Sequence, residues 1–180
     1  MRLLKTAFHP DVSPADVTPA SNLTMVERRA ARGIVLQDDD ILLLYTDRYQ
    51  DYSLPGGGID EGENEIDGLK RELQEETGAR DVRNITPFAR YDEYRPWYKD
   101  DADIVYMISH CYLCDIDEEL GETSYEPYEQ SNGMKPLWMN IHNAIAHNEQ
   151  VIAESDRKGL SIERETFLLK IIAEELVPRR

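Results

Sequence analysis

The chain has 180 residues, of which 36 are acidic and 20 are basic, so its formal net charge is −16 at pH 7. A surface this acidic repels the phosphates of nucleic acids and of anionic membranes, and we expect neither as a partner. Hydrophobic residues make up 41% of the chain. This is enough for the core of one folded domain, and we expect a single domain over residues 1–180.

The N-terminal residues 1–27 contain three prolines and show no regular hydrophobic pattern. They predict an irregular arm, or an edge strand laid over the domain, without a chemical role. The N-terminus lacks the apolar core of a signal peptide, and no run approaches the roughly 20 apolar residues that span a bilayer. We therefore expect a cytoplasmic protein.

Two apolar runs follow the arm. Residues 30–36 and 41–46 predict a β-hairpin, because the four residues between them are polar and acidic. Residues 52–54 then lead into a proline and three glycines. Glycine permits backbone angles and close approaches that side chains forbid, so we expect substrate to lie against this loop at Gly57 and Gly58.

Residues 64–77 predict a helix at the centre of the chain. Asn64 is its expected N-cap and Gly78 its C-terminal stop. Apolar residues recur at spacings of three and four and share one face, which predicts that this face is buried. These residues are Ile66, Leu69 and Leu73.

A second face of this helix carries Glu72, Glu75 and Glu76 at positions i, i+3 and i+4. Three like charges this close destabilise an isolated helix, but carboxylate oxygens are ligands that suit Mg²⁺ or Mn²⁺. A glutamate-rich helix is ordinarily a solvated surface. The preceding glycine loop and the arginine at position 71 favour a metal site instead.

Strands and helices alternate in the remainder of the chain. Residues 85–91 and 103–114 predict strands, joined by an aromatic and charged segment. Residues 134–140 predict another strand, followed directly by a short helix. Residues 161–176 predict an amphipathic helix within a C-terminal helical segment of residues 148–180. Strands on either side of one helix, with further helices at the end, predict a mixed sheet between helical layers.

The cysteines and histidines lack the spacing of a shared metal site. Cys111 and Cys114 form a C-x-x-C sequence, but in a strand positions three apart face opposite sides. We therefore expect no joint zinc or redox role for them. The scattered histidines are interpreted as structural, and these are His110, His142 and His147.

The stretch from Gly57 to Ala79 fits the pattern G-x5-E-x7-R-E-U-x-E-E-x-G-U, in which U is an aliphatic residue. This is the signature of the Nudix hydrolases, a family that the chain closely resembles. The resemblance implies an α/β/α sandwich with a mixed β-sheet and a loop-helix-loop catalytic motif. Ala79 is a mild departure, because a larger aliphatic residue is commoner at that position.

The same resemblance implies roles for the residues of the motif. Glu72, Glu75 and Glu76 would bind the divalent metal, Mg²⁺ or Mn²⁺, and one of them could also act on the attacking water. Arg71 would orient these acids by pairing with Glu63 or with a metal-binding carboxylate. Glu63 would have either this bracing role or one that faces the metal. The other nearby acids, Asp60, Glu61, Glu65 and Asp67, are interpreted as ordinary solvated residues.

A diphosphate resists attack by water because its oxygens are already negative, so a catalyst must neutralise them and supply an activated water. The motif therefore predicts a metal-dependent hydrolase that cleaves the diphosphate bond of a nucleoside diphosphate linked to another moiety. Two alternatives remain open. One is a nucleotide-sensing Nudix module without catalysis, and the other is an isomerase of the isopentenyl diphosphate type.

Further candidates lie outside the motif. Many family members take another metal ligand or a general base from a later loop, and residues 117–133 form an acidic segment here. Glu126 and Glu129 lie nearest the following strand and are the preferred candidates for this extra acid.

Aromatic and basic residues between positions 91 and 99 suit the binding of a base and a phosphate, with Tyr94 and Trp97 as candidates. The competing interpretation is an interface or a loop packed on the core. Arg32 and Arg48 could also reach the anion. The expected substrate is a small nucleotide-type molecule, and the arm and the aromatic segment leave a homodimer open.

Overall fold

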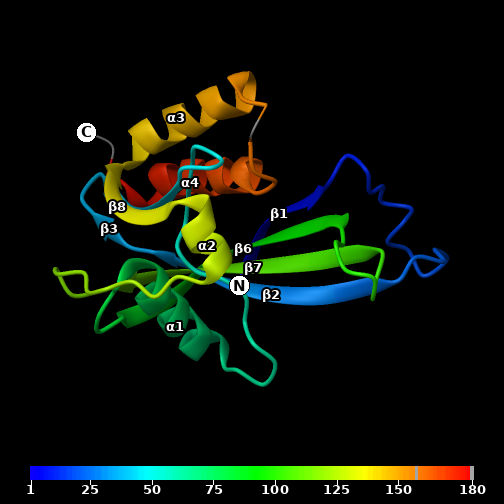
Figure 1. Ribbon diagram of the computed structural model, residues 1–180, viewed down its shortest axis with the longest axis horizontal. Helices are drawn as coiled ribbons and strands as arrows, with labels where there is room; N and C mark the ends of the chain where they lie inside the picture. The colour runs from blue at the N-terminus through cyan, green and yellow to red at the C-terminus, as the bar shows by residue number, and fades with distance from the viewer. Residues whose placement is uncertain (157, 179–180) are drawn as a thin grey trace.

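The computed structural model describes residues 1–156 and 158–178, and over these residues it contains eight strands and four helices. Helix α1 (Glu65–Thr77) lies on one side of the strands, whereas α3 (Ile141–Glu154) and α4 (Ile162–Leu176) lie on the other (Figure 1). The predicted α/β architecture with helices on both sides is confirmed. None of the described helices is long and apolar enough to cross a membrane.

The first sheet has the strand order β1-β6-β7-β2. Its members are β1 (Arg2–Phe8), β6 (Arg83–Pro96), β7 (Ile104–Asp115) and β2 (Met25–Ile34). Strands β1 and β6 pair in parallel, β6 and β7 are antiparallel, and β2 and β7 are parallel. The sheet is therefore mixed, as predicted.

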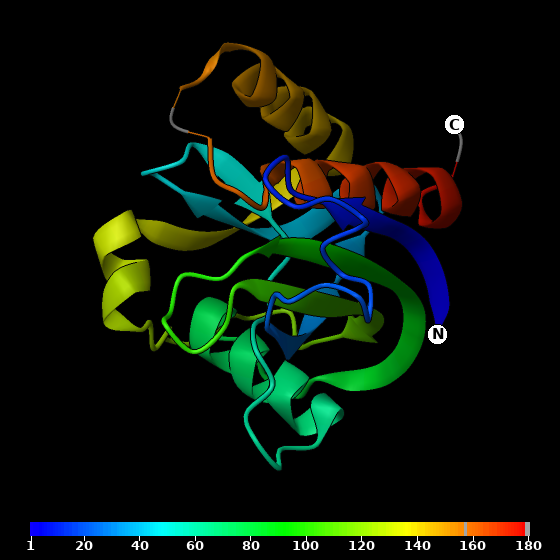
Figure 2. The same cartoon turned by 90° about the vertical axis from the view of Figure 1, so that its right-hand side faces the viewer.

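The second sheet is antiparallel. Strand β4 (Asp40–Thr46) pairs with β3 (Leu36–Gln37), with β5 (Asp51–Ser53) and with β8 (Met134–Asn140). Figure 2 shows the strands of both sheets between the helices. The described residues thus form two sheets where the sequence predicted one.

The prediction of a hairpin between residues 30–36 and 41–46 is wrong for most of the residues involved. The chain leaves the first sheet at Val35, so β2 pairs with β7, and only Leu36–Gln37 pairs with β4. Residues 30–36 are divided between the two sheets, because β2 ends at Ile34 and β3 begins at Leu36. A local pattern does not show where a strand changes its partner.

Two hydrophobic cores lie on opposite faces of the strands. Alternate residues of β4 enter them: Leu43 packs with α3 and α4, whereas Leu42 packs with α1. The cysteines are divided in the same way, since Cys111 belongs to the first core and Cys114 to the second. Both are buried and free, so the expected absence of a shared site agrees with their positions.

Within residues 1–27 the structure has the second of the two predicted alternatives, because β1 pairs with β6 as an edge strand. Two further elements differ in extent from the sequence prediction. Strand β6 continues to Pro96, beyond the predicted end at residue 91, because its pairing with β7 extends that far. The helix after β8 has 14 residues and is not short.

Candidate active site

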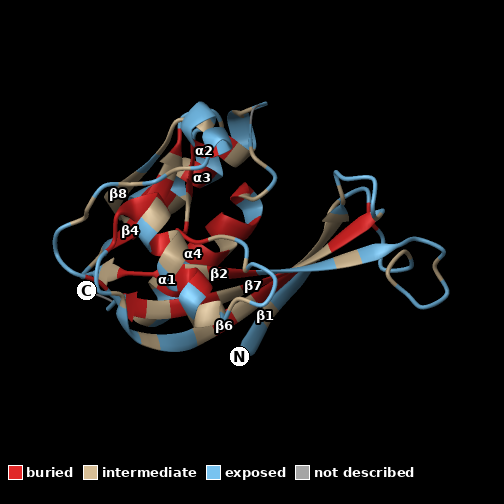
Figure 3. Cartoon of the chain, turned by 60° about the horizontal axis from the view of Figure 1, so that its bottom comes forward, coloured by how far each residue is buried: buried red, intermediate tan, exposed pale blue. Residues whose placement is uncertain are grey.

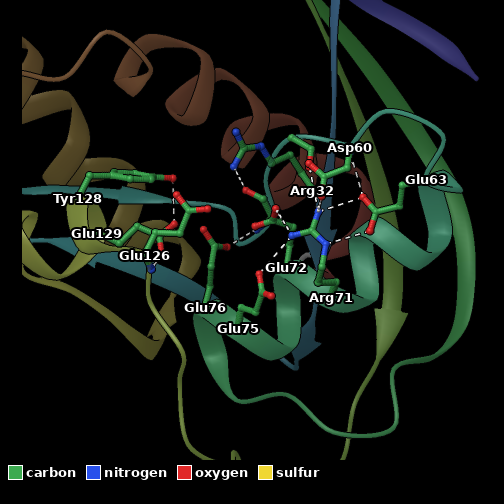
Figure 4. Close-up of polar contacts among 12 residues, drawn as sticks. Arg32, Asp60, Glu63, Arg71, Glu72, Glu75, Glu76, Glu126, Tyr128 and Glu129 are labelled. Atoms are coloured by element: carbon green, nitrogen blue, oxygen red, sulfur yellow. Dashed lines mark hydrogen bonds and ion pairs between the residues drawn. The ribbon is translucent and has the colours of Figure 1, made fainter.

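A cavity of about 460 Å³ opens between the glycine loop, α1, the start of α4 and the short helix α2 (Pro127–Asn132). In Figure 4, Glu76 from α1 and Glu129 from α2 point into the same space. The cavity brings together the predicted metal ligands and both predicted extra acids, which are Glu72, Glu75, Glu76, Glu126 and Glu129.

The orientation of α1 follows from its capping and its apolar stripe. The Asn64 side chain accepts a hydrogen bond from the Ile66 N–H, and Gly78 ends the helix in the left-handed region at φ 70°. Leu69 and Leu73 are fully buried against the second core. Burial of this stripe turns the glutamate face of the helix toward the cavity.

Arg71 joins the loop of the motif to its helix. Its Nε and Nη2 atoms donate to the two carboxylate oxygens of Glu63 at 2.9 and 3.0 Å. Its Nη1 atom donates to Glu72 at 2.8 Å and to Glu75 at 3.2 Å. Hydrogen bonding to Arg71 holds the pKa of Glu63 at about 2, so this carboxylate stays charged. Arg71 thus contacts both Glu63 and the helix glutamates, which are the two kinds of partner that the resemblance implied for it.

Glu76 is the most deeply buried acid of the motif, with 5% of its surface exposed. Burial raises its pKa to about 8, against the effect of the Gly56 N–H, which donates to its Oε2 atom at 2.5 Å. Burial also raises the pKa of Glu72. The apolar surroundings therefore disfavour charge at these carboxyls unless a cation neutralises it.

The glycine loop approaches the helix too closely for a side chain. A Cβ atom at Gly57 would lie 2.5 Å from Oε2 of Glu72. This contact explains the glycine at the first position of the motif, because the loop backbone and a carboxylate occupy adjoining space. Gly57 and Gly58 both line the cavity, where the sequence predicted substrate contacts.

The two candidate extra acids differ in their surroundings. Glu129 is 5% exposed, and its carboxylate accepts hydrogen bonds from the Glu126 N–H at 2.8 Å and from the Tyr128 hydroxyl at 3.0 Å. Glu126 precedes α2 and is exposed. The charge of Glu129 is close enough to Glu76 to raise the pKa of that residue further. Glu129 is therefore the candidate that lies against the motif.

Carboxylate oxygens are the donors that divalent metal ions prefer, and the cavity supplies several of them. Within residues 1–156 and 158–178, however, no three His, Cys, Asp or Glu side chains are grouped around a single ion position. Arg71 holds Glu72 and Glu75 through hydrogen bonds in this arrangement. Binding of one ion by all three helix glutamates would therefore require their side chains to move closer together.

Sequence reasoning missed three charged residues of the cavity wall. Asp51 and Glu165 are buried, and Arg164 is buried between Glu165 at 2.8 Å and Glu93 at 3.0 Å. One signal was available for α4, because Glu165 stands three residues after the buried Ile162 and therefore on the apolar stripe. A charge on such a stripe predicts a buried ion pair or a site.

The predicted substrate contacts are distributed unevenly. Arg32 lines the cavity, and its Nη1 atom donates to the Gly56 carbonyl. Arg48 does not line it, but it donates to Asn132, which does. Trp97 lines an adjacent cavity. Tyr94 lines neither, because its ring is stacked between Phe8 and Tyr106 on the sheet.

The interpretation of Glu65 as a solvated acid is wrong. Its carboxylate contacts the His110 ring nitrogen Nδ1 and accepts a hydrogen bond from the Tyr112 hydroxyl. The start of α1 packs against β7, where two residues spaced two apart on the strand share one face. These contacts attach the catalytic helix to the sheet. Asp60, Glu61 and Asp67 are exposed, as predicted.

Two curated proteins match a short part of the chain. A protein of Bartonella quintana (strain Toulouse), named RNA pyrophosphohydrolase, is 47% identical over 47 residues, which are 26% of this chain and 24% of that protein. A protein of the same name from Ruthia magnifica subsp. Calyptogena magnifica is 48% identical over 52 residues, or 28% of this chain and 29% of that protein. The chain thus spans about a quarter of the length of these relatives.

Two solved structures match part of the chain. A protein of Chromobacterium violaceum, described as a Nudix hydrolase family member, matches with a TM-score of 0.50 and 20% identity, over 83% of this chain and 78% of that one. A MutT Nudix hydrolase from Burkholderia pseudomallei matches with a TM-score of 0.48 and 18% identity, over 65% and 85%. The first of these likenesses supports a common fold.

The family model of the NUDIX domain matches residues 27–160, which extend from β2 to the end of α3 and stop just before α4. The match covers well over half of the chain and includes the entire motif. Because the motif, the fold and this match agree, the chain belongs to the Nudix hydrolase family.

Proposed function

We propose that this protein is a metal-dependent pyrophosphohydrolase that cleaves the diphosphate bond of a nucleoside diphosphate linked to another moiety. The observation that supports this proposal most strongly is the cavity in which the carboxyl groups of Glu72, Glu75, Glu76 and Glu129 face Arg32 and the glycine loop. Nudix hydrolases generally use divalent metals. A bound Mg²⁺ or Mn²⁺ would neutralise the charge of the diphosphate oxygens and lower the pKa of a water molecule.

The residues of the chain divide this work. Glu72, Glu75 and Glu76 would hold the cation, and Arg71 positions Glu72 and Glu75 through the fork that also binds Glu63. The backbone of Gly57 and Gly58 leaves room for the diphosphate against the helix.

The reaction requires a group that takes a proton from water. Water attacks one phosphorus, its oxygen forms the new P–O bond, and the bond to the bridging oxygen breaks. The products are a nucleoside monophosphate and a phosphorylated remainder. Glu126 and Glu129 are the candidates for the proton acceptor because both line the cavity outside the helix, and the burial of Glu129 beside Glu76 favours Glu129.

The two alternatives receive less support from the geometry. An isomerase of the isopentenyl diphosphate type would need a catalytic cysteine at the cavity. Cys111 and Cys114 lie in the two cores, and burial raises the pKa of each thiol to about 12. A sensing module without catalysis would show a damaged motif, whereas every fixed acid and the arginine are present here.

The test is turnover of a defined panel with Mg²⁺ or Mn²⁺. The panel comprises ADP-ribose, a nucleotide sugar, NADH, diadenosine tetraphosphate, nucleoside triphosphates and a 5′-triphosphorylated oligoribonucleotide, with release of product followed by chromatography. The oligoribonucleotide is included because the matched relatives are named RNA pyrophosphohydrolase.

The control pair compares a buried and an exposed acid of the same motif. Glu76→Gln should lower kcat at least about 100-fold, because it removes a metal-binding charge while keeping the shape. Glu61→Gln, at an exposed position outside the cavity, should stay within about twofold. Equal activity of the two variants would contradict the assignment. Silence of the unaltered protein across the panel, with Mg²⁺ shown to bind, would favour the sensing module.

A further inference from the structure

A second cavity, of about 480 Å³, adjoins the candidate active site. It shares lining residues with the first, and these are Arg32, Gly58, Asp60, Glu126 and Tyr128. The two cavities are therefore adjacent, and one substrate can extend from the first into the second. The two cavities differ in charge, because acids outnumber arginines among the charged residues that line the first, whereas arginines outnumber acids among those that line the second.

The second cavity lies between strands of the first sheet, the glycine loop and the start of α2. The outer ends of β2, β6 and β7 extend beyond α1 and α4 (Figures 1 and 3). Arg28, Ala30 and Arg32 alternate along β2 and so share one face, and Met107 lies opposite Arg28 on β7. Arg95 comes from β6 on the same face. The strand register therefore gathers arginines from separate strands into one pocket.

We call the set Arg28, Arg32 and Arg95 the arginine pocket. Among the described residues Arg28 forms no ion pair, and its guanidinium lies 5.5 Å from the centre of the Trp97 ring. The Nε atom of Arg32 is buried and has no hydrogen-bond partner within the described chain, and the charges of Glu72 and Glu76 lie near this guanidinium. Arg29 also lines the cavity, but it alternates with Arg28 along β2, and its side chain pairs with Glu27 at 3.0 Å.

Arg95 is largely buried and poorly compensated. Its nearest carboxylate is Glu93 at 4.0 Å, which already accepts a hydrogen bond from Arg164 at 3.0 Å. Burial lowers the pKa of Arg95, and so do the neighbouring cations Arg164 and Arg32. The charge of Glu93 raises this pKa but does not outweigh the burial. The three arginines of the pocket face two carboxylates that line it, Asp60 and Glu126, which leaves an excess of positive charge among these lining residues.

Trp97 keeps one of these arginines in place. Its indole N–H donates to Asp101 at 2.7 Å, which fixes the ring at the edge of the pocket. The face of the ring then attracts the Arg28 guanidinium by a cation–π contact. A guanidinium held this way remains free to donate its N–H groups to a planar or tetrahedral anion.

We propose that the arginine pocket binds a phosphate group of the substrate beyond the diphosphate bond that is cleaved. This inference rests on the proposed function, because it places the cleaved bond at the acidic cavity. It names a substrate class: small nucleotides with three or more phosphates, such as nucleoside triphosphates or dinucleoside polyphosphates. Arginine forks suit phosphate oxygens, and a protein with a net charge of −16 needs local cations to hold such a polyanion.

The kinetic test compares substrates with different numbers of phosphates. Arg28→Gln and Arg95→Gln should each lower kcat/KM for ATP and diadenosine tetraphosphate by about 10- to 100-fold, the size expected for one charge-assisted contact. The value for ADP-ribose, with two phosphates, should stay within about twofold. Arg80→Gln makes the same change of charge at an exposed arginine outside both cavities and should leave every value unaltered. Equal losses for all substrates, or none, would overturn the inference.

A binding measurement separates this inference from the proposed function. Calorimetric titration with Mg²⁺ and methylene-bridged analogues of ATP and ADP requires no turnover. The triphosphate analogue should bind at least about tenfold more tightly than the diphosphate analogue, and Arg28→Gln should remove most of that difference. Equal affinities would refute the arginine pocket even in an active hydrolase. A difference that depends on Arg28 in an inactive protein would refute only the proposed hydrolysis.

Discussion

Arg71 is the residue through which the loop and the helix of the motif act as one unit. A guanidinium presents five N–H donors in a planar fork, and Arg71 uses this fork on Glu63, Glu72, Glu75 and the Gly58 carbonyl. A lysine carries the same charge but cannot make the two parallel bonds to Glu63. The position therefore depends on geometry as well as on charge.

Arg71→Lys should reduce metal affinity or kcat by about 10- to 100-fold, the usual effect of losing a group that orients metal ligands. The measurement is activity as a function of Mg²⁺ concentration, with circular dichroism to confirm folding. Arg83→Lys is the matched control, because Arg83 also pairs with two carboxylates but lies outside the active-site cavity. The same activity profile for both variants would show that the fork is dispensable.

Asp51 is a buried acid whose protonation is linked to folding. Burial, and then the charge of Glu165, raise its pKa from 3.8 to about 6. The folded protein therefore binds this proton more tightly than the unfolded chain does. The resulting stabilisation is fully present below pH 4 and is lost as the pH rises through 6.

Asp51→Asn should therefore gain stability relative to the unaltered protein between pH 4 and pH 7, by about 1 to 3 kcal/mol. Urea denaturation at several pH values and constant ionic strength measures the difference. Asp100→Asn, in the exposed loop between β6 and β7, serves as the control. A difference between Asp51→Asn and the unaltered protein that does not change with pH would show that Asp51 is not linked in this way.

At the scale of elements, the end of α1 is fixed by a close contact with a distant loop. Gly78 has φ 70°, and a Cβ atom there would lie 2.2 Å from the Gly121 carbonyl oxygen. Gly62 also has a positive φ, of 80°, but no atom lies within 4 Å of its Cβ position. A side chain at Gly62 would thus introduce backbone strain alone, whereas a side chain at Gly78 would also overlap with a neighbouring atom.

Gly62→Ala should destabilise the protein by about 1 to 2 kcal/mol, the cost of a left-handed backbone with a side chain. Gly78→Ala should cost at least about 3 kcal/mol, because the backbone near Gly121 must also move. Chemical denaturation of both variants gives the comparison. Equal losses would mean that the Gly121 loop yields freely and does not hold the helix.

At the scale of the whole molecule, the net charge of −16 opposes the compact state. Part of that charge is concentrated in the acidic cavity, where the buried Glu76 forms no ion pair with any of the described residues. The effect of salt screening on stability should therefore be distinguishable from the effect of Mg²⁺ binding in the cavity. NaCl screens all charges alike, whereas Mg²⁺ at the same ionic strength should also occupy the cavity.

Raising NaCl should increase Tm modestly, and MgCl₂ at about 100 times its Kd should add about 2.7 kcal/mol, or roughly 5 to 10 °C. Glu76→Gln should lose this additional increase while keeping the response to NaCl. Thermal melts of both proteins in the two salts provide the test. Identical responses to the two salts at equal ionic strength would argue against a metal site in the cavity.

The residues that were predicted from the sequence have contacts close to them in the chain, whereas the residues that were missed have contacts far away in the chain. Helix α1 was predictable because Asn64, Gly78 and the Leu69–Leu73 stripe lie within one short segment. Glu129 was found only as one of two candidates, because its approach to Glu76 depends on how α2 packs. Glu165 was missed, since its partners Leu54 and Arg164 include a strand end more than 100 residues away.

The sequence by itself determined the family motif, the helix that carries the glutamates and the alternation that separates Cys111 from Cys114. These features depend on local backbone periods and on the chemistry of individual side chains. Only the tertiary structure decided that β2 and β4 belong to different sheets and that Arg28 and Arg95 share a pocket. The physical reason is that strand pairing and register join residues far apart in the chain, and no local pattern specifies them.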